Sequence, residues 1–177
     1  MQRIGVVGAT GYTGFELLRL LSCHDSVELV LVTSEKYNEK NVSEVFPSLE
    51  RYSSLKFQNF NEENCKNLDL IFCCLPHKVS MNIVPSLLKL GSKVVDFSAD
   101  YRLKDKSVYE SWYEIEHTSP DLISAAVYGM PELYRKEIQD SQLVANPGCY
   151  PTGAILSLVP LAKEGLINPS SIVIDAK

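Results

Sequence analysis

The hydrophobic positions of this 177-residue chain fall into short runs that alternate between strand-like and helix-like spacing. Four brief apolar runs, each containing β-branched residues, lie at residues 2–7, 27–32, 69–74 and 93–97. Such runs are typical of strands that are buried on both faces of a parallel sheet. Residues 15–21 and 79–90 place apolar side chains at helical intervals between them. The alternation predicts a doubly wound α/β fold, a Rossmann-type and mostly parallel sheet with flanking helices.

The remaining stretches carry weaker patterns. Residues 38–53 are polar and contain Pro47, which predicts a loop with one helical turn. Further strands are expected at residues 55–60, 143–145 and 171–175, and further helices at residues 107–117 and 152–163. Pro85 lies inside the helix expected at residues 79–90, so it is predicted to kink that helix or to mark its boundary.

Composition and charge narrow the classes of function. Hydrophobic residues make up 45 % of the chain and charged residues 22 %, as in ordinary soluble globular proteins. The formal net charge of −5 argues against a nucleic-acid partner, because phosphate binding needs a basic face. No apolar run reaches the roughly 18 residues of a membrane helix, and Met1 leads directly into a strand rather than a signal peptide. We therefore expect a cytoplasmic protein without a membrane partner.

The cysteines do not form a recognisable framework. There are five of them, and their spacing fits neither a disulfide scaffold nor a zinc site, so we expect reduced thiols and no bound metal. Cys73 and Cys74 are neighbours in a predicted strand and must point to opposite faces. Both are interpreted as packing residues, and so are Cys23 and Cys65.

A glycine-rich segment joins the first strand to the first helix. The run Gly8-Ala9-Thr10-Gly11-Tyr12-Thr13-Gly14 has the spacing G-x-x-G-x-x-G instead of the commoner G-x-G-x-x-G. Glycines allow a tight turn and a close approach to a pyrophosphate, and the helix N-terminus offers free N–H groups. A plain turn without a ligand is the alternative. The position directly after the first strand favours dinucleotide binding.

The end of the second strand bears on the choice of dinucleotide. NAD enzymes usually place an acidic residue there, about 20 residues beyond the glycines, to hold the ribose 2′-hydroxyl. Ser34 stands at that position and Lys36 is near. A hydroxyl and a cation suit a 2′-phosphate, so NADP is the favoured cofactor. Glu35 leaves NAD open, because a shift of one residue would restore the acid.

Cys149 lies between a predicted strand and a predicted helix, after the turn Pro147-Gly148. A helix N-terminus favours a thiolate, and the backbone N–H groups that follow could hold an oxyanion. Asn146 adds a side-chain donor beside it. The local context leaves two interpretations open: a reactive thiol, or a small apolar packing residue.

Five ordered motifs resemble the N-acetyl-gamma-glutamyl-phosphate reductase family, which is related to aspartate-semialdehyde dehydrogenase. They are the glycine-rich run at residues 8–14, Leu75-Pro76-His77, Asp-Phe-Ser-Ala-Asp-Tyr-Arg-Leu at 96–103, Val-Tyr-Gly-Met-Pro-Glu at 127–132 and Ala-Asn-Pro-Gly-Cys-Tyr-Pro-Thr at 145–152. The resemblance covers essentially the whole chain. It implies NADPH-dependent reduction of N-acetyl-gamma-glutamyl phosphate, a small-molecule substrate of arginine biosynthesis, to the semialdehyde. Phosphate is released, and Cys149 carries a thioester intermediate.

The resemblance also implies roles for other residues. The cofactor would be held by Gly8, Thr10, Gly11, Tyr12, Thr13, Gly14, Ser34, Leu75, Pro76 and His77. The substrate would lie near Ser98, Arg102 and Asn146. Arg102 could instead form a structural salt bridge with Asp96 or Asp100. His77 is an alternative candidate for the catalytic base, although the family's catalytic histidine comes from a later segment. His24 and His117 are expected to be structural or exposed.

Members of this family are roughly twice as long as this chain. Residues 1–148 are therefore expected to form the NAD(P)-binding domain, and residues 149–177 to begin a substrate domain. We expect a truncated protein that is inactive alone, with a homo-oligomeric full-length enzyme. An aspartate-semialdehyde dehydrogenase-like reductase and an isolated nucleotide-binding module remain alternatives. A nucleotide-sugar epimerase is a more remote one, because it needs a catalytic Tyr-x-x-x-Lys pair, which we do not expect in this chain.

Overall fold

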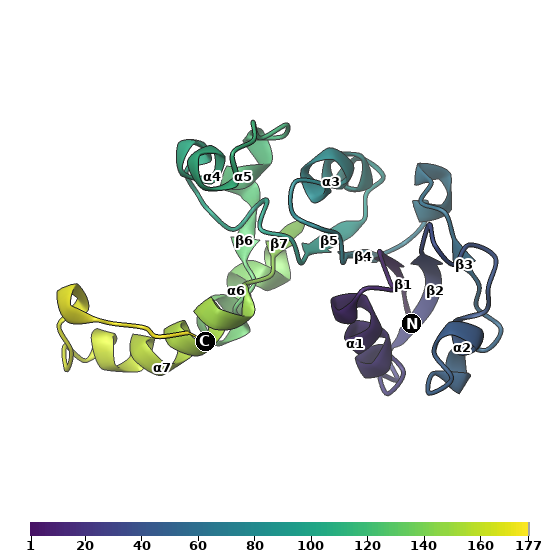
Figure 1. The fold of residues 1–177 in the computed structure, drawn as a ribbon, viewed down its shortest axis with the longest axis horizontal. Coiled ribbons are helices and arrows are strands. Elements are labelled where there is room, and N and C mark those ends of the chain that lie inside the picture. The colour runs from purple at the N-terminus through teal and green to yellow at the C-terminus, as the bar shows by residue number, and fades with distance from the viewer. Residues whose placement is uncertain (177) are drawn as a thin grey trace.

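The sheet of the computed structural model, which describes residues 1–176, contains seven strands that all pair in parallel (Figure 1). The strands are β1 (Gln2–Val7), β2 (Val27–Thr33), β3 (Phe57–Gln58), β4 (Leu70–Cys73), β5 (Lys93–Asp96), β6 (Val127–Tyr128) and β7 (Leu143–Ala145). Their order is β3-β2-β1-β4-β5-β7-β6. From β1 the chain adds β2 and β3 on one side of β1, and it then crosses back to place the remaining strands on the other side of β1. The sheet therefore has a topological switch point between β1 and β4, where doubly wound folds bind ligands.

Helices cover the two faces of this sheet. They are α1 (Tyr12–Leu21), α2 (Val42–Val45), α3 (Ser80–Lys89), α4 (Lys106–Tyr113), α5 (Asp121–Ala125), α6 (Pro131–Asp140) and α7 (Cys149–Lys163), with short 3₁₀ turns η1 (Glu50–Tyr52), η2 (Glu62–Cys65) and η3 (Pro169–Ser171). In Figure 1, α3, α4 and α5 lie on one side of the sheet, and α1 and α2 lie on the other. Helix α7 extends away from the sheet, and the tail that follows it runs back alongside.

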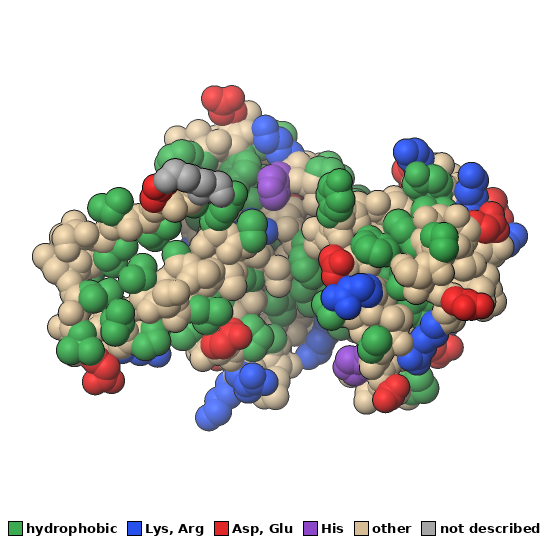
Figure 2. Space-filling model, turned by 60° about the horizontal axis from the view of Figure 1, so that its bottom comes forward, with side chains coloured by type: hydrophobic (Ala, Val, Ile, Leu, Met, Phe, Trp, Pro, Cys, Tyr) green, Lys and Arg blue, Asp and Glu red, His purple; other side chains and the backbone are tan. Residues whose placement is uncertain are grey.

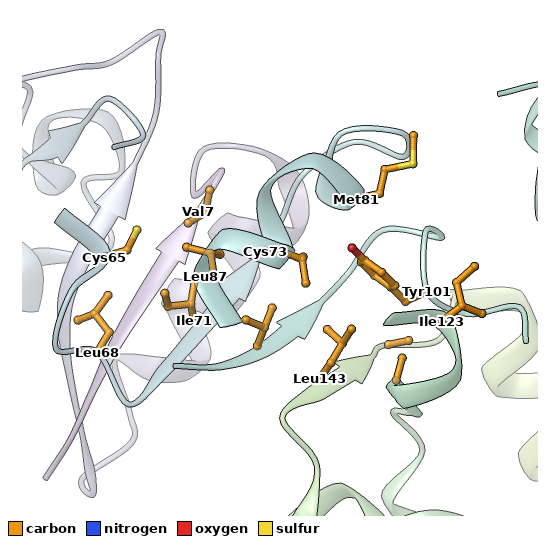
Figure 3. Close-up of a cluster of buried hydrophobic side chains, with 14 of the residues drawn as sticks. Val7, Cys65, Leu68, Ile71, Cys73, Met81, Leu87, Tyr101, Ile123 and Leu143 are labelled. Atoms are coloured by element: carbon orange, nitrogen blue, oxygen red, sulfur yellow. The ribbon is translucent and has the colours of Figure 1, made fainter. Parts of the chain in front are cut away.

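The sheet has one apolar core on each of its two faces, because successive residues of a strand face opposite sides. Ile4 and Val6 of β1 pack with α1, whereas Val7 belongs to the cluster beneath α3 that Figure 3 shows. Likewise, Cys73 lies in the α3 cluster and Cys74 packs against the other one. The expected packing roles of this cysteine pair are therefore confirmed.

The strong patterns of the sequence correspond to observed elements. The four predicted apolar strands became β1, β2, β4 and β5, and the strand expected at residues 55–60 shortened to β3. Pro85 lies within α3 without ending it. Helix α7 begins at Cys149, three residues earlier than the predicted start at Thr152. Strand β6 and helix α6 were not anticipated, because β6 has only two residues and α6 buries none.

Two predictions were wrong. Residues 172–175 form no strand, and their side chains are exposed. An apolar run becomes a strand only where another strand offers a ladder of hydrogen-bonding groups. Cys23 was interpreted as a packing residue, but it lies exposed in the turn after α1. Cys65 is buried as expected.

Two general features of the described residues bear on function. No helix among residues 1–176 is long and apolar enough to cross a membrane. The same part of the chain contains no group of three or more His, Cys, Asp or Glu side chains that could hold a metal ion.

Candidate active site at the carboxyl edge of the sheet

The chemically interesting side chains follow the strands in spatial order. Ser34 follows β2, the glycine-rich turn follows β1, His77 follows β4, Arg102 follows β5, and Cys149 follows β7. Since all these strands are parallel, their carboxyl ends meet at one edge of the sheet. Residues that are far apart in the sequence thus form a continuous row.

The glycine-rich turn requires glycine at two of its three glycine positions. Gly8 has φ +79°, and a Cβ there would lie 2.5 Å from the Cys74 carbonyl oxygen. A Cβ on Gly14 would lie 2.6 Å from the carbonyl carbon of Ala9. Gly11 precedes α1, and a Cβ on it would meet nothing within 4 Å. The space in front of Gly11 is therefore open to a ligand that approaches the backbone.

Ser34 lies directly beside this turn. Its hydroxyl is 3.0 Å from the Thr10 hydroxyl, and the Ala9 N–H donates to the carbonyl of Thr33 at 2.9 Å. The Glu35 carboxylate instead accepts the N–H of Phe60 at 3.1 Å, so it faces the segment after β3. The position next to the turn thus carries a neutral hydroxyl and not an acid.

One cavity of about 550 Å³ joins the turn to the predicted nucleophile. Its lining residues are Thr13, His77, Phe97, Arg102, Asn146, Pro147, Gly148, Cys149 and Thr152. A second, apolar cavity of about 310 Å³ adjoins the start of α1 and is lined by Thr10, Gly11, Tyr12, Phe15 and Phe46. Together, the two cavities are lined by eight of the fourteen sequence-predicted site residues: Thr10, Gly11, Tyr12, Thr13, His77, Arg102, Asn146 and Cys149.

Cys149 is the first residue of α7 and is exposed to the larger cavity. Gly148 caps the helix, and its carbonyl accepts hydrogen bonds from the N–H and the hydroxyl of Thr152, at 3.1 and 2.8 Å. The N–H groups of a first helical turn have no partner within the helix, and they stabilise negative charge beside them. These N–H groups can therefore hold an oxyanion that forms beside Sγ.

The other thiols contrast with Cys149. Burial raises the pKa of Cys65 to about 11 and that of Cys74 to about 12, and it also raises the pKa of Cys73 well above its usual value. These three thiols stay protonated at neutral pH. Cys23 is exposed but lies after α1, outside the cavity. Cys149 is the one thiol among residues 1–176 that borders the candidate site.

Arg102 connects two strand ends. Its Nε donates to the Asn146 carbonyl and its Nη2 to the Phe97 carbonyl, both at 2.7 Å. The Nη1 atom would lie 3.2 Å from a Cβ placed on Gly148, so it is next to the N-terminus of α7. The alternative salt bridges with Asp96 or Asp100 are not formed in residues 1–176. The guanidinium keeps an unneutralised charge at the cavity wall.

The two aspartates have structural partners of their own. Asp100 is fully buried, and its carboxylate accepts the N–H groups of Lys78 and Met81, at 2.8 and 3.0 Å, and the Tyr109 hydroxyl at 2.8 Å. It thereby caps the start of α3. Asp96 accepts the Ser98 hydroxyl at 2.6 Å, and burial raises the pKa of the Asp96 carboxyl.

Several predicted residues lie apart from the larger cavity. Ser98 is fully buried, and its hydroxyl joins Asp96 to the Asp100 N–H instead of facing the cavity. Leu75 approaches the glycine turn, since its Cδ2 would lie 3.1 Å from a Cβ on Gly8. Pro76 is exposed, and Tyr12 is 97 % exposed at the mouth of the apolar cavity.

Sequence reasoning missed some residues of the site. Phe97 and Thr152 line the larger cavity, and Phe15 and Phe46 line the apolar one. Thr152 could have been found from its place one turn into the helix that begins at Cys149. Phe46 carries no such signal, because it comes from a loop and meets Phe15 only in the fold, with ring centroids 4.8 Å apart.

The expectation that no Tyr-x-x-x-Lys pair is present was wrong, because Tyr52 and Lys56 have this spacing. Their position in the fold nevertheless separates them from the candidate site. Tyr52 is only 9 % exposed and packs in the core beneath α1, beside a different cavity that includes Met1 and Val27. That cavity lies at the amino ends of β1 and β2, so this pair does not meet the glycine-rich turn. His117 is also structural: it is buried, and its Nε2 donates to the Asp100 carbonyl at 2.8 Å.

The parallel sheet, its switch point and its glycine-rich turn define a nucleotide-binding α/β domain of the doubly wound class. Residues 3–141 match the family described as semialdehyde dehydrogenase, NAD binding domain, and the chain belongs to this family.

Named relatives extend over the whole chain. It is 52 % identical to the N-acetyl-gamma-glutamyl-phosphate reductase of Desulfotalea psychrophila and 51 % identical to that of Geotalea daltonii. Each comparison covers 100 % of this chain and 51 % of the relative. The chain thus spans about half the length of the curated relatives that it matches.

Solved structures confirm the predicted fold. Aspartate semialdehyde dehydrogenase II from Vibrio cholerae, complexed with ASA, superposes with a TM-score of 0.63 at 18 % identity, over 92 % of this chain and 47 % of that one. The enzyme from Candida albicans with NADP gives a TM-score of 0.60 at 19 % identity, over 94 % and 48 %. At these identities the likeness concerns the fold alone.

Proposed function

We propose that the chain is the cofactor-binding part of an NADPH-dependent N-acetyl-gamma-glutamyl-phosphate reductase, which converts the acyl phosphate to the semialdehyde and releases phosphate. The observation that carries the proposal is Cys149, exposed at the N-terminus of a 15-residue helix in one cavity with Arg102 and with Thr13 of the glycine-rich turn. Relatives of that name at about 50 % identity support the choice of substrate.

The residues at the turn fit the dinucleotide. Gly8 and Gly14 leave no room for a side chain, and the open space at Gly11 lets a pyrophosphate approach the N–H groups at the start of α1. The hydroxyls of Thr10 and Ser34, 3.0 Å apart, offer donors for a ribose 2′-phosphate. The outward Glu35 removes the acid that would favour NAD. NADPH, when bound, supplies the hydride.

Cys149 performs the covalent step. Its thiolate attacks the carbonyl carbon of the acyl phosphate, and the bond between that carbon and the phosphate oxygen breaks. Inorganic phosphate leaves with the bonding electron pair, and a thioester remains on Sγ. The N–H groups of the first turn of α7 face the oxygen that becomes negative during this attack. After reduction, expulsion of the aldehyde regenerates the thiolate.

Arg102 and Asn146 prepare the substrate side. The Nη1 group of Arg102 lies at the wall beside Gly148, where it can hold a phosphate or carboxylate of the substrate. Two further guanidinium donors are used by backbone carbonyls, so the charge is held in place before the substrate binds. Asn146 donates its side-chain amide to the Pro147 carbonyl at 3.1 Å, which shapes the turn before Cys149.

We also infer the division at residue 148. Residues 1–148 form the sheet and its covering helices, and the segment from Cys149 begins a second structural unit that serves the substrate. None of the residues that line the larger cavity is assigned as the proton-transfer partner of the thiol, and we predict no turnover with NADPH for residues 1–177. The cytoplasmic location and a homo-oligomeric longer enzyme stay predictions.

Acylation of the thiol tests the proposal without requiring hydride transfer or proton transfer. The chain is incubated with N-acetyl-gamma-glutamyl phosphate, and the intact mass and the released phosphate are measured. One acyl group should be added to the wild type and to the matched control Cys23→Ala, and none to Cys149→Ala. Equal acylation of Cys149→Ala would contradict the assigned nucleophile. Faster acylation by aspartyl phosphate would favour the aspartate-semialdehyde alternative.

Cofactor binding is tested separately. NADPH fluorescence should rise on titration with the chain, and NADH should bind at least about tenfold more weakly, as expected for a lost charge-assisted contact. Binding of NADPH without any acylation of Cys149 would instead support the isolated nucleotide-binding module.

A further inference from the structure

His77 is a wall residue of the larger cavity that has no role in the steps described so far. It follows β4, and β4 lies between β1, which leads into the glycine-rich turn, and β5, which leads to Arg102. His77 therefore stands between the residues proposed for the pyrophosphate and those proposed for the substrate.

The imidazole of His77 is fixed in one tautomer. The Ala99 N–H donates to Nδ1 at 2.9 Å. A backbone N–H can only donate, so Nδ1 must present its lone pair, and the neutral ring carries its proton on Nε2. No group within residues 1–176 accepts a hydrogen bond from this Nε2–H. The ring thus has one free donor on an exposed side chain at the cavity.

The surrounding loop holds the ring in place. The buried Asp100 carboxylate accepts the N–H groups of Lys78 and Met81, on the chain just beyond His77. Lys78 has φ +73°, a conformation that this carboxylate helps to hold. The ring of Tyr113 meets the His77 ring edge-on, with centroids 5.8 Å apart. The donor is therefore organised before any ligand binds.

We propose that His77 donates its Nε2–H to the carboxamide oxygen of the nicotinamide ring and so fixes which way that ring faces. The inference rests on the proposed cofactor. A dinucleotide held near Ser34 after β2 and at the turn after β1 continues past the end of β4, because that is the order of the strands. The carboxamide oxygen is the hydrogen-bond acceptor that the ring brings there.

The same geometry separates His77 from the role of catalytic base. A base needs a free lone pair, and the Nδ1 lone pair of His77 already accepts the Ala99 N–H. Nε2 carries the proton and has no lone pair to offer. His77 is thus a cofactor-orienting donor, and the proton needed to release the aldehyde comes from another group.

Two substitutions of His77 distinguish the role of the Nε2–H donor from that of the Nδ1 acceptor for the Ala99 N–H. In His77→Asn the amide oxygen can replace Nδ1 as the acceptor for Ala99, but the side chain is too short to replace the Nε2–H. In His77→Gln the amide nitrogen reaches the Nε2 position. Dissociation constants are measured on this chain for NADP⁺, for thionicotinamide NADP⁺, in which sulfur replaces the carboxamide oxygen, and for 2′,5′-ADP, which lacks the nicotinamide.

We expect His77→Asn to bind NADP⁺ about fivefold to tenfold more weakly than the wild type, as for the loss of one hydrogen bond. His77→Gln should stay within about twofold. All three proteins should bind 2′,5′-ADP equally. The sulfur analogue should bind the wild type several-fold more weakly than NADP⁺, and His77→Asn should not distinguish the two.

Two results would overturn the inference: unchanged NADP⁺ binding in His77→Asn, or a wild type that binds the sulfur analogue as tightly as NADP⁺. The second comparison needs no variant, so it decides the matter even if a substitution prevents folding. If 2′,5′-ADP still binds in either case, only the role of His77 fails. If the wild type binds neither NADP⁺ nor 2′,5′-ADP, the proposed cofactor fails with it.

Discussion

Helices α1 and α3 of the sheet region and helix α7 all carry apolar side chains, but they bury them very differently. Helix α3 buries Met81, Val84 and Leu87 against the sheet, and α1 buries Leu18 and Leu21. Helix α7 is apolar over most of its 15 residues, and none of them is buried. Figure 2 shows the resulting scatter of apolar side chains over α7 and the tail.

This difference shows which helices are enclosed by other elements of the structure and which are not. A helix that is apolar all round is normally enclosed by other elements. The sheet region encloses its own helices, whereas no residue of α7 is buried. Cys149 is the first residue of α7, so the proposed chemistry lies where the closed core of the sheet region meets a helix with exposed apolar side chains. The exposed fractions of 70 % for Leu166 and 90 % for Val173 extend this surface into the tail.

The largest expected contrast is in stability. Ile71→Ala should lower the free energy of unfolding by about 2–5 kcal/mol, because Ile71 is fully buried under α3 and the change leaves a cavity. Leu161→Ala in α7 removes a similar side chain that is 41 % exposed, and it should cost about 0.5 kcal/mol or less. Urea unfolding curves of both variants measure the difference. Equal losses would show that α7 is as tightly packed as the sheet.

A smaller effect should depend on pH. Burial raises the pKa of Cys74 in the folded chain to about 12, above the value of an exposed thiol, so folding favours the protonated form. The stabilisation is complete below the unfolded pKa near 9 and is lost as the pH rises through 12. Between these values, Cys74 should contribute a loss of up to about 1.4 kcal/mol per pH unit.

Unfolding midpoints from pH 8 to pH 11 test this dependence. Cys74→Ala should lose stability less steeply than the wild type, and Cys23→Ala, which removes an exposed thiol, should follow the wild type. Identical slopes for all three proteins would mean that the Cys74 thiol is not held in a buried environment.

The smallest predicted effect concerns the polar support of the site. Tyr109→Phe removes one of the three donors to the Asp100 carboxylate and should cost about 1–2 kcal/mol, in the range for a hydrogen bond to a charged group. Thermal unfolding would give this number. Since Asp100 also holds the loop that follows His77, amide exchange at Lys78 and Met81 should quicken in the variant and stay unchanged in α7.

Sequence patterns sufficed for β1, β2, β4 and β5, because each is an apolar run that is buried within the sheet. The same reasoning failed for residues 172–175, where the pattern was equally apolar but no strand within residues 1–176 pairs with it. Strand β6 shows the converse, since two residues become a strand only because β7 lies beside them. Pairing partners are a property of the fold and not of the segment.

For the site, too, prediction depended on whether the signal was local or came from other segments of the fold. The turn at Gly8, the thiol at Cys149 and the cation at Arg102 could be proposed from the sequence because each carries a local signature or a family motif. The placement of Ser98 could not be foreseen. Its motif neighbours Arg102 in the sequence, yet its hydroxyl is turned into a buried network with Asp96 and Asp100. Which member of a polar run faces the cavity depends on hydrogen-bond partners from other segments.

Arg102 couples affinity to rigidity. The cation that would attract a ligand also ties the Phe97 carbonyl after β5 to the Asn146 carbonyl after β7. A ligand held by Nη1 would therefore be anchored to both strand ends through one side chain. A substitution of Arg102 would remove this anchor together with the link between the two strand ends. Selection for tighter binding and selection for a firmer fold therefore act here on the same side chain.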